Sequence, residues 1–447
     1  MNQSTADFIR RHAGDDVRQL ALRGTKDPEV DLTLALDQIA GRQTARRKLP
    51  TWADMEGLVY PPHLAMEQCS SELTARYKAR LCDADNSRPR TLVDLTGGFG
   101  VDFSFMAQHF AEAVYVERQQ PLCDIARHNF QLLGLTQATV VCGDGVDYLQ
   151  QMAPADVVYI DPARRDSHGA RTYGINDCTP DVLALLPLLV RKAHCVLLKL
   201  SPMLDWRKTV SDLGDDLVSE VHIVAVGNEC KELLVKMNCE KNEREKVEDG
   251  KDEKGEKAKD EKGEKAQPLR VVCVNILSDG TEDRFDSSLF PLPSSLPKDS
   301  SFFTLPSSLP KDSSLSTFPS SLFPFPFLLV PNAAIMKAGC FTELAQHFGL
   351  QPIAANSHLF VADHPVERFP GRMFRIKAVS TMNKRDLRQH LGTLTQANIT
   401  VRNFPLSVAD LRRRLKLGDG GDTYIFATTL ASGEHVLLIT EAVARSV

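Results

Sequence analysis

Short apolar runs alternate with helix-like stretches across residues 89–238, a pattern typical of the strands and helices that build a parallel sheet. We expect five parallel strands here, followed by a hairpin that turns at Gly227-Asn228, and one further strand beyond a charged segment. The expected parallel strands are 91–95, 113–117, 138–142, 156–160 and 195–200, the hairpin strands are 221–226 and 231–237, and the later strand is 269–277.

The segments on either side of this pattern differ from it. Residues 1–88 contain periodic stretches such as VDLTLALDQIAG, interrupted by LPTW and YPP, and predict an N-terminal helical region. Residues 329–372 predict a small α/β piece, and residues 373–447 predict a C-terminal block of mixed strands and helices. Together these patterns predict an α/β protein of several domains.

Two segments lack the pattern of a folded core. In residues 240–265, 20 of 26 positions are charged, so we expect a solvated insertion that is helical or disordered. In residues 287–327, 21 of 41 positions are Ser or Pro and SSLPKDSS occurs twice, so residues 287–328 are expected to be a flexible linker. Expansion without function explains both segments, although the apolar residues among the prolines leave room for a partner-docking motif.

Composition narrows the class of protein. The chain has 447 residues, of which 43% are hydrophobic and 25% are charged, as in soluble proteins of two to four domains. No apolar run approaches the ~20 residues of a membrane span, and the first residues lack the apolar stretch of a signal peptide. Ten scattered cysteines include no C-x-x-C pair. We therefore expect a cytoplasmic protein with reduced thiols, no metal site and no membrane partner.

Charge is uneven along the chain. The net charge is −5, whereas residues 373–447 carry 11 Lys or Arg against 6 Asp or Glu. The stretches NKRDLRQ (383–389) and LRRRLKLG (411–418) place these cations at helical spacing. Such a face can bind RNA phosphates without reading bases, and it can equally be an ordinary solvated helix face.

The strongest chemical signal is the segment DLTGGFG at residues 94–100, which follows an expected strand and opens a helical pattern. Glycines there let the backbone turn sharply and approach a ligand closely, and the helix behind them offers free N–H groups. A tight turn that binds no ligand is the alternative.

Acidic residues follow the next three strands. Glu117 ends the second strand, where a carboxylate can accept hydrogen bonds from both hydroxyls of a ribose. Asp144 follows the third strand, where a carboxylate can hold an adenine amino group, and Asp161 follows the fourth. Each acid alone can also be a solvated loop residue or a helix cap. Together with Asp94 they are expected to meet, because the carboxyl ends of the strands form one crevice in a doubly wound sheet.

These motifs resemble those of class I S-adenosylmethionine-dependent methyltransferases. DLTGGFG resembles the family's cofactor loop D-x-x-x-G-x-G, with Thr96 where the family often has glycine. DPAR at residues 161–164 resembles the D/N-P-P-x motif of enzymes that methylate planar amines in nucleic acids, with Ala163 in place of the second proline. The resemblance implies S-adenosyl-L-methionine as the cofactor, bound by Asp94, Thr96, Gly98, Gly100, Glu117 and Asp144.

More narrowly, the chain resembles bacterial methyltransferases that carry a C-terminal THUMP-like domain. The matching stretches include YPPHLAMEQCSSELTARYKARL (60–81), LKLSPMLDW (198–206) and GNECKELL (227–234). The resemblance implies a Rossmann-like class I methyltransferase sheet, a small ferredoxin-like α/β piece and a C-terminal THUMP-like α+β domain. The expected domains are therefore 1–88 (N-terminal helical region), 89–286 (methyltransferase, with the charged insertion 240–265), 287–328 (linker), 329–372 (ferredoxin-like) and 373–447 (THUMP-like).

The residues after the fourth strand predict how an acceptor is held. Asp161 and the carbonyl of Pro162 can accept the two N–H bonds of an exocyclic amine and keep its lone pair toward the methyl group. Arg164 and Arg165 can stack on a base or bind a phosphate, or they can pair within the loop. Tyr173 can stack on a base or pack as a loop aromatic. We assign Asp161 and Pro162 to catalysis, and Arg164, Arg165 and Tyr173 to the substrate.

One competing chemistry can be tested in the sequence. Methylation of pyrimidine C5 commonly needs a cysteine nucleophile, and the place where related enzymes have it reads Lys199-Leu200-Ser201-Pro202, without a thiol. The sequence thus favours an enzyme that methylates an exocyclic base amine in RNA, either tRNA or rRNA. A methyltransferase of a protein or small molecule, and a non-catalytic RNA-binding module, are the alternatives.

The helix before the glycine segment is a further candidate. Ser70 and Ser71 are placed to cap it. Tyr77 and Lys78 either contribute to a helix that closes over the cofactor or lie on the helix surface.

Overall fold

The computed structural model describes residues 1–82, 90–164, 174–239, 268–289 and 325–444. The chain folds into two compact units. Unit 1 comprises Met1–His222 and Lys231–Leu269, and unit 2 comprises Ile223–Cys230 and Arg270–Val447. This division is coarser than the five segments expected from the sequence.

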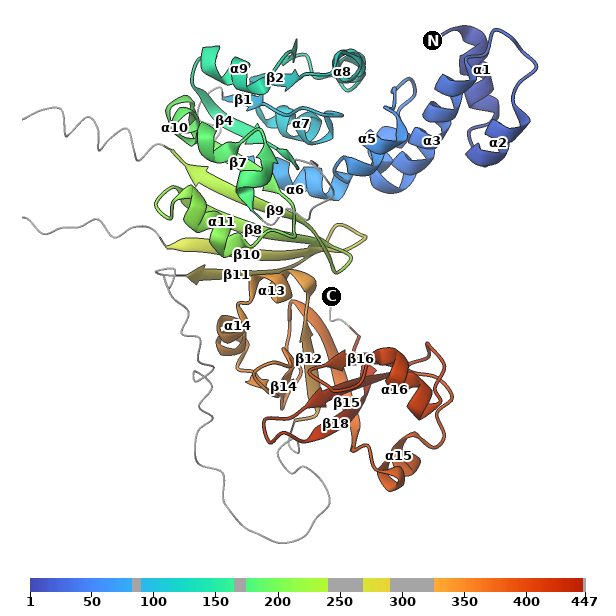
Figure 1. The fold of residues 1–447 in the computed structure, drawn as a ribbon, viewed down its shortest axis with the longest axis vertical. Coiled ribbons are helices and arrows are strands. Elements are labelled where there is room, and N and C mark those ends of the chain that lie inside the picture. The colour runs from blue at the N-terminus through green and yellow to red at the C-terminus, as the bar shows by residue number, and fades with distance from the viewer. Residues whose placement is uncertain (83–89, 165–173, 240–267, 290–324, 445–447) are drawn as a thin grey trace, which may run out of the picture. The chain divides into compact units, whose positions relative to one another are not determined.

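Unit 1 begins with six helices, of which the first ones extend to one side of its sheet (Figure 1). Asn2, Asp16 and Asp31 cap the first three helices, and each side chain accepts a hydrogen bond from the backbone N–H three residues later. The described part of the N-terminal region is thus helical, as predicted. The helices are α1 (Gln3–Arg11), α2 (Val17–Arg23), α3 (Leu32–Lys48), α4 (Pro50–Ala53), α5 (His63–Gln68) and α6 (Glu72–Cys82).

Five parallel strands form the centre of unit 1, in the order β7-β4-β1-β2-β3. β9 pairs antiparallel with β7, and β8 lies next to β9. Every strand predicted between residues 89 and 238 is present, within three residues of its predicted ends. The strands are β1 (Thr91–Asp94), β2 (Glu112–Glu117), β3 (Ala138–Cys142), β4 (Ala155–Ile160), β7 (Ala193–Leu200), β8 (Val218–Val226) and β9 (Glu229–Asn238).

The predicted hairpin turn has the expected backbone. Gly227 and Asn228 both have positive φ, at 56° and 67°. Two-residue turns of this conformation match the twist of the strands that they join.

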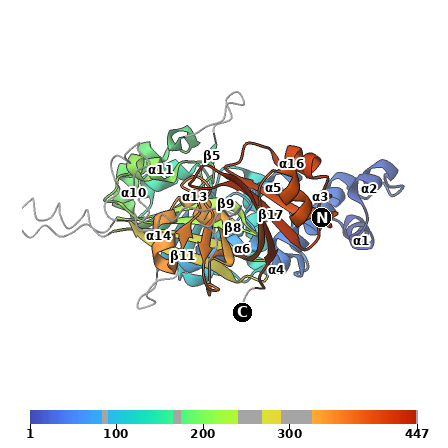
Figure 2. The ribbon, with the colours of Figure 1, turned by 90° about the horizontal axis from the view of Figure 1, so that it is seen from below.

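Helices separate the parallel strands along the chain and cover them. β4 is buried at all six positions, as expected for a central strand covered on both faces. Two of the helices, α10 and α11, lie side by side (Figures 1 and 2). The helices are α7 (Val101–Met106), η1 (Ala107–His109), α8 (Gln120–Leu132), α9 (Gly145–Gln151), η2 (Ile175–Asp177), α10 (Val182–Lys192) and α11 (Trp206–Leu213), and the short strands β5 (Ala163–Arg164) and β6 (Cys178–Thr179) pair with each other.

Unit 2 is built around a sheet of seven strands in the order β13-β14-β12-β15-β18-β17-β16. The predicted strand at 269–277 is also present, as β10. The elements are β10 (Leu269–Ile276), β11 (Glu282–Leu289), β12 (Phe327–Pro331), α13 (Ala333–Ala338), α14 (Phe341–Phe348), β13 (Gln351–Pro352), β14 (Phe360–Ala362), β15 (Gly371–Ser380), α15 (Lys384–Leu391), β16 (Asn398–Arg402), α16 (Val408–Leu415), β17 (Thr423–Thr429) and β18 (His435–Ala442).

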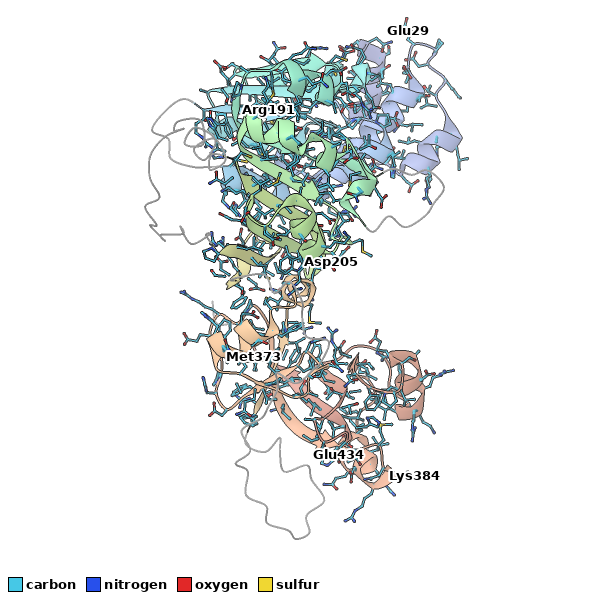
Figure 3. The ribbon with its side chains drawn as sticks, turned by 60° about the vertical axis from the view of Figure 1, so that its left-hand side comes forward. Glu29, Arg191, Asp205, Met373, Lys384 and Glu434 are labelled. Atoms are coloured by element: carbon cyan, nitrogen blue, oxygen red, sulfur yellow. The ribbon has the colours of Figure 1, made fainter. Side chains whose placement is uncertain are left out.

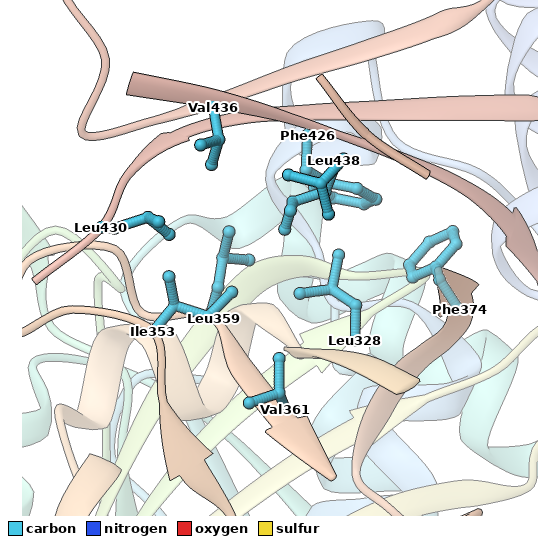
Figure 4. Packing of buried hydrophobic residues seen from close by; sticks show 10 residues of the cluster. Leu328, Ile353, Leu359, Val361, Phe374, Phe426, Leu430, Val436 and Leu438 are labelled. Atoms are coloured by element: carbon cyan, nitrogen blue, oxygen red, sulfur yellow. The ribbon is translucent and has the colours of Figure 1, made fainter. Parts of the chain in front are cut away.

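The segments expected to form a ferredoxin-like and a THUMP-like domain share one sheet and one core. β12 pairs antiparallel with both β14 and β15, and β15 pairs with β18. Leu328 and Val361 from the first segment pack with Phe374, Phe426 and Leu438 from the second (Figure 4). The two segments are therefore joined by strand pairing as well as by the chain.

The ends of the expected linker are structured. β11 continues to Leu289, past the expected start at 287, and β12 begins at Phe327, before the expected end at 328. Ser287 is buried in β11, and Phe327 pairs with Ala362 and Arg375, so both ends of the expected linker belong to strands of a sheet.

No helix among the described residues has the length and hydropathy to cross a bilayer.

Two glycines in unit 1 allow a matched test of its packing. Gly100 and Gly134 both have positive φ (82° and 72°), but a Cβ at Gly100 would lie 2.8 Å from the ring of Phe130, whereas nothing lies within 4 Å at Gly134. We expect Gly134→Ala to lower the free energy of unfolding by about 1 kcal/mol through backbone strain, and Gly100→Ala to lower it by about 1–3 kcal/mol more through overpacking.

The measurement is urea unfolding followed by tryptophan fluorescence. Both tryptophans, Trp52 and Trp206, are buried in unit 1, so their emission reports on this unit. Equal losses for the two variants would contradict the close contact at Gly100.

Candidate functional site

A cleft of about 930 Å3 lies in unit 1 at the carboxyl ends of the parallel strands. Its walls come from the loops after β1, β2, β3, β4 and β7 and from the end of α5. β1 lies between β2 and β4, so the strand order reverses here, and open α/β sheets bind ligands at such a reversal. The acids Asp94, Glu117, Asp144 and Asp161 all line this cleft.

Close backbone contacts shape the loop after β1. Gly97 N–H donates to the carbonyl of Val116 (2.9 Å), and a Cβ on Gly97 would lie 2.2 Å from the ring of Tyr115. The Tyr115 hydroxyl in turn donates to the carbonyl of Gly98. Gly98 and Gly100 have positive φ (56° and 82°), and no atom lies closer than 3.8 Å to where a Cβ on Gly98 would stand. The loop therefore turns tightly and leaves room beside its backbone at Gly98.

Asp94 and Thr96 hold this loop in place. The buried Asp94 carboxylate accepts the backbone N–H of Thr96 (2.9 Å), and burial raises the pKa of Asp94 well above its ordinary value. The Thr96 hydroxyl accepts the backbone N–H of Asp161 (2.7 Å). The residue that departs from the usual glycine thus connects the loop after β1 to the loop after β4.

Glu117 is anchored through both carboxylate oxygens. Oε2 accepts the backbone N–H of Gly98 and Oε1 accepts that of Gln119, each at 2.9 Å. Each carboxylate oxygen has a further lone pair, so Glu117 can still accept hydrogen bonds from a ligand. We term the loop after β1, residues 94–100, the glycine loop, and its Gly98 N–H helps to orient the Glu117 carboxylate in the cleft.

Asp144 has the helix-capping role that was the alternative to ligand binding. Its Oδ1 accepts the backbone N–H groups of Val146 (2.8 Å) and Asp147 (3.4 Å) at the start of α9. The neighbouring Gly145 packs against the glycine loop, since a Cβ there would lie 2.1 Å from the carbonyl oxygen of Leu95. Capping keeps Asp144 at the wall of the cleft.

The substrate side of the cleft is described in part. Asp161 and Pro162 line it. The backbone of Arg164 pairs with Cys178 in β6, while the Arg164 side chain, Arg165 and Tyr173 lie outside the described residues. Their assignment to the substrate stays a prediction.

Behind the cleft, five charged side chains of alternating sign form what we term the charge chain: Glu232, Lys78, Asp102, Lys199 and Asp161. Successive nitrogen–oxygen distances along it are 2.5, 3.1, 3.7 and 2.6 Å. Among the described residues no group of three or more His, Cys, Asp or Glu side chains is placed to hold a metal ion. The ammonium groups of Lys78 and Lys199 lie within ion-pair distance of these carboxylates and offset their charge.

The charge chain runs from the interior of unit 1 to the cleft. The exposed fraction of the side chain is 0% for Lys78, 5% for Glu232, 11% for Asp102, 13% for Lys199 and 38% for Asp161. Lys199 and Asp161 line the cleft, while Lys78 does not reach solvent. The wall of the cleft thus contains the ion pair of Lys199 and Asp161, and Asp102 lies beside Lys199 on the side away from Asp161 in the charge chain.

Neutral groups add hydrogen bonds to the charge chain. Ser70 donates to Asp102 (2.8 Å) and lies within 3.1 Å of the Lys78 ammonium, and Tyr159 also donates to Asp102 (2.8 Å). Burial alone would raise the pKa of Asp102, but the two lysines and these hydrogen bonds bring the pKa below its ordinary value. Burial likewise works against the ammonium of Lys199, yet Asp161 and Asp102 raise its pKa. Lys199 is therefore a cation.

Most residues of the charge chain were not predicted from the sequence. For Lys78 and Tyr77, two alternatives were open: a helix that closes over the cofactor, or the surface of that helix. Both side chains are buried, so the surface alternative is wrong. Of the two serines expected to cap α6, Ser71 accepts the backbone N–H of Thr74 (3.3 Å), whereas Ser70 belongs to the charge chain's hydrogen bonds.

A signal for these residues was nevertheless present. Lys199 and Glu232 each interrupt a mostly apolar strand, CVLLKL and KELLVKM. A charged residue inside a buried strand needs a partner of opposite charge. The pairing itself joins residues more than 150 positions apart, Lys78 and Glu232, and no local pattern reveals it.

Comparison with known proteins agrees with this architecture. Residues 371–442 match the sequence profile of a THUMP domain-like family, and residues 327–370 match that of a ferredoxin-like domain. A solved structure from Porphyromonas gingivalis W83, assigned as a methyltransferase, is 30% identical, and the alignment covers 99% of this chain and 98% of that one with a TM-score of 0.76. The chain belongs to this methyltransferase family. The resemblance to methyltransferases with a C-terminal THUMP-like domain is thereby confirmed.

One segment of unit 1 has a second set of relatives. Residues 87–167 match the profile of protein-L-isoaspartate(D-aspartate) O-methyltransferase. A curated protein-L-isoaspartate O-methyltransferase from Thermotoga maritima is 31% identical over 72 residues, which are 15% of this chain. The chain spans 23% of the length of that relative. The segment that matches the profile, residues 87–167, contains the glycine loop, Glu117, Asp144 and Asp161.

The charge chain generates a stability prediction for this methyltransferase. Lys78→Met removes a fully buried ammonium and leaves Glu232 and Asp102 without their shared cation. Breaking a buried ion pair by removing one partner costs about 3–5 kcal/mol, and we expect a loss of that size in urea unfolding followed by tryptophan fluorescence.

Lys208→Met is the matched control, because Lys208 is 60% exposed in α11 and pairs with Asp212 four residues later. Its expected effect is within about 0.5 kcal/mol. If Lys78→Met unfolded at the same urea concentration as Lys208→Met, the charge chain would not contribute to the stability of unit 1.

Proposed function

We propose that this chain is an S-adenosyl-L-methionine-dependent methyltransferase that acts on RNA. The observation that carries the proposal is the meeting of the glycine loop, Glu117 and Asp161 in one cleft at the reversal of strand order. Family membership supports methyl transfer as the reaction.

The residues of the cleft suit this cofactor. Gly98 leaves open space beside its backbone, which a nucleoside and its amino-acid tail need for close approach. Glu117 would accept hydrogen bonds from the ribose hydroxyls, Asp144 would face the adenine, and the loop of Asp94, Thr96 and Gly100 would hold the remainder. When bound, the sulfonium of the cofactor supplies an electrophilic methyl group. The protein aligns an acceptor with it and excludes water.

Two features support RNA as the substrate. The first is the match of residues 371–442 to a THUMP domain-like family. The second is the excess of cations in residues 373–447, where Lys384, Arg385 and Arg388 are exposed on α15 and the Lys384 side chain points away from the sheet (Figure 3). The ten cysteines are free thiols, which suits the cytoplasm, where RNA is available.

Two acceptor chemistries suit the wall around Asp161. The motif at residues 161–164 favours an exocyclic base amine, held by Asp161 and the Pro162 carbonyl. Lys199 favours a hydroxyl instead, because its ammonium lies 2.6 Å from Asp161 Oδ2 and faces the same cleft. Both acceptors place Asp161 at the reaction centre.

The first test is the transfer of label from methyl-tritiated cofactor to total RNA from cells that lack this gene. Wild type is expected to give RNase-sensitive label, and Asp161→Ala is expected to lose it by at least about 100-fold, the usual contribution of a group that handles the reacting proton. Affinity for S-adenosylhomocysteine, measured by calorimetry, is expected to change little.

The outcomes separate the alternatives. Label in protein, or in a small molecule, would replace RNA by that acceptor class. Cofactor affinity without label in any fraction would favour an RNA-binding module. Loss of cofactor affinity in Asp161→Ala would remove Asp161 from its catalytic assignment.

The second test concerns unit 2. Arg385→Gln with Arg388→Gln is expected to weaken binding to unfractionated tRNA and to lower the slope of log affinity against log salt by about 1 for each phosphate contact removed. Arg10→Gln, on the exposed face of α1, is the control and is expected to leave both quantities unchanged. An unchanged affinity and slope in the double variant would exclude α15 from the RNA-binding surface.

A further inference from the structure

From the charge chain we infer that the methyl acceptor is a hydroxyl, the ribose 2′-hydroxyl of an RNA nucleotide, and that Lys199 and Asp161 act on it together. The inference rests on the proposed function and selects between its two acceptor chemistries. It starts from a cation that neither the motif at residues 161–164 nor the comparisons assign: Lys199, whose ammonium lies 2.6 Å from Asp161 Oδ2 in the wall of the cleft.

The two acceptors differ in the charge that they develop. An exocyclic amine becomes more positive as its nitrogen bonds to the methyl carbon, and a fixed ammonium beside it opposes that change. A hydroxyl loses a proton, so its oxygen becomes more negative, and an ammonium stabilises that change. Because Lys199 is held as a cation by Asp161 and Asp102, its field favours the hydroxyl throughout the reaction.

Asp161 is placed to take the proton. Its Oδ2 accepts the Lys199 ammonium, and its Oδ1 has no hydrogen-bond partner among the residues that the structure describes. Its backbone is fixed to the glycine loop through Thr96, so the carboxylate has a set position relative to the cofactor loop. A hydroxyl donating to Oδ1 would lie beside Lys199.

The step balances without a further reactant. The hydroxyl oxygen forms a bond to the methyl carbon, the carbon–sulfur bond of the sulfonium breaks, and its electron pair stays on sulfur. The proton of the hydroxyl passes to the Asp161 carboxylate, which returns it to solvent, since its side chain is 38% exposed.

The remainder of the charge chain keeps Lys199 in place. Asp102 lies 3.7 Å behind its ammonium, and Asp102 is held in turn by Lys78, Ser70 and Tyr159. A lysine side chain is long and flexible, so a carboxylate behind it as well as one beside it restricts where its charge can be. Lys78 and Asp102 are positioning residues in this scheme, and Lys199 and Asp161 touch the acceptor.

The position of the methyl group decides the acceptor. RNA labelled by wild-type enzyme is hydrolysed with alkali, which cleaves next to a free 2′-hydroxyl and leaves a 2′-O-methylated nucleotide within a dinucleotide. We expect the label in alkali-resistant dinucleotides. Label in mononucleotides as a methylated base would overturn the inference and leave the proposed function standing, whereas absence of label from RNA would overturn both.

The role of Lys199 has its own test. Lys199→Met keeps the length of the side chain and removes the charge, and we expect the rate of methyl transfer to fall at least about 100-fold while the affinity for S-adenosylhomocysteine stays within about threefold. Lys199→Arg restores a cation and is expected to recover part of the rate. Lys208→Met, on the exposed face of α11, is the control and is expected to match wild type.

The thermal midpoint and the affinity for S-adenosylhomocysteine of each variant are measured together with the rates. A variant that is slow because it is unfolded is then recognised by a lowered thermal midpoint and by lost affinity. A folded Lys199→Met enzyme that binds S-adenosylhomocysteine and transfers methyl groups at the wild-type rate would overturn the assignment. So would a fall in rate that Lys199→Arg deepens rather than relieves.

Discussion

Two lysines that neutralise three carboxylates in the interior of unit 1 are the constraint on which the site depends. The five side chains come from α6, α7, the loop after β4, β7 and β9, so the ion pairs connect two helices to three neighbouring strands of the sheet. Buried ion pairs contribute little to net stability because desolvation offsets their attraction. Their effect here is on position: moving any one of these elements would leave a charge in the interior without a partner.

Local patterns sufficed for the strands and for the glycine-rich turn after β1. The five parallel strands are apolar runs of ordinary strand length, and polar residues follow each run, so each strand was predicted within a few residues. The glycine-rich segment was recognisable because it follows a strand and opens a helix. The structure adds that a Cβ at Gly97 or Gly100 would collide with the rings of Tyr115 and Phe130. What a pattern could not show is the use of Thr96, whose hydroxyl accepts the backbone N–H of Asp161 from another loop.

Long-range pairing accounts for what the sequence did not reveal. Lys78 appears in a helix whose neighbours include Arg76 and Arg80, so nothing local separates the buried cation from exposed ones. Its partner Glu232 is more than 150 residues away, and only the folded sheet brings them together. The same holds in unit 2, where β12 and β15 pair across the boundary between two expected domains. Strand pairing depends on which apolar edges remain open, and single segments do not carry that information.

Asp161 is the point at which the two parts of the site meet. Its backbone N–H is held by Thr96 of the glycine loop, and its carboxylate is held by Lys199 of the charge chain. In the proposed function, the first contact sets the position of an acceptor relative to the glycine loop, and the second would give that acceptor a cation as a neighbour. If the acceptor were a neutral amine, the first contact would help to align it, but the Lys199 cation would oppose the positive charge that develops on its nitrogen. Keeping both contacts is consistent with a hydroxyl that gives up its proton while the bond to the methyl carbon forms, because alignment and charge stabilisation then act at the same oxygen atom.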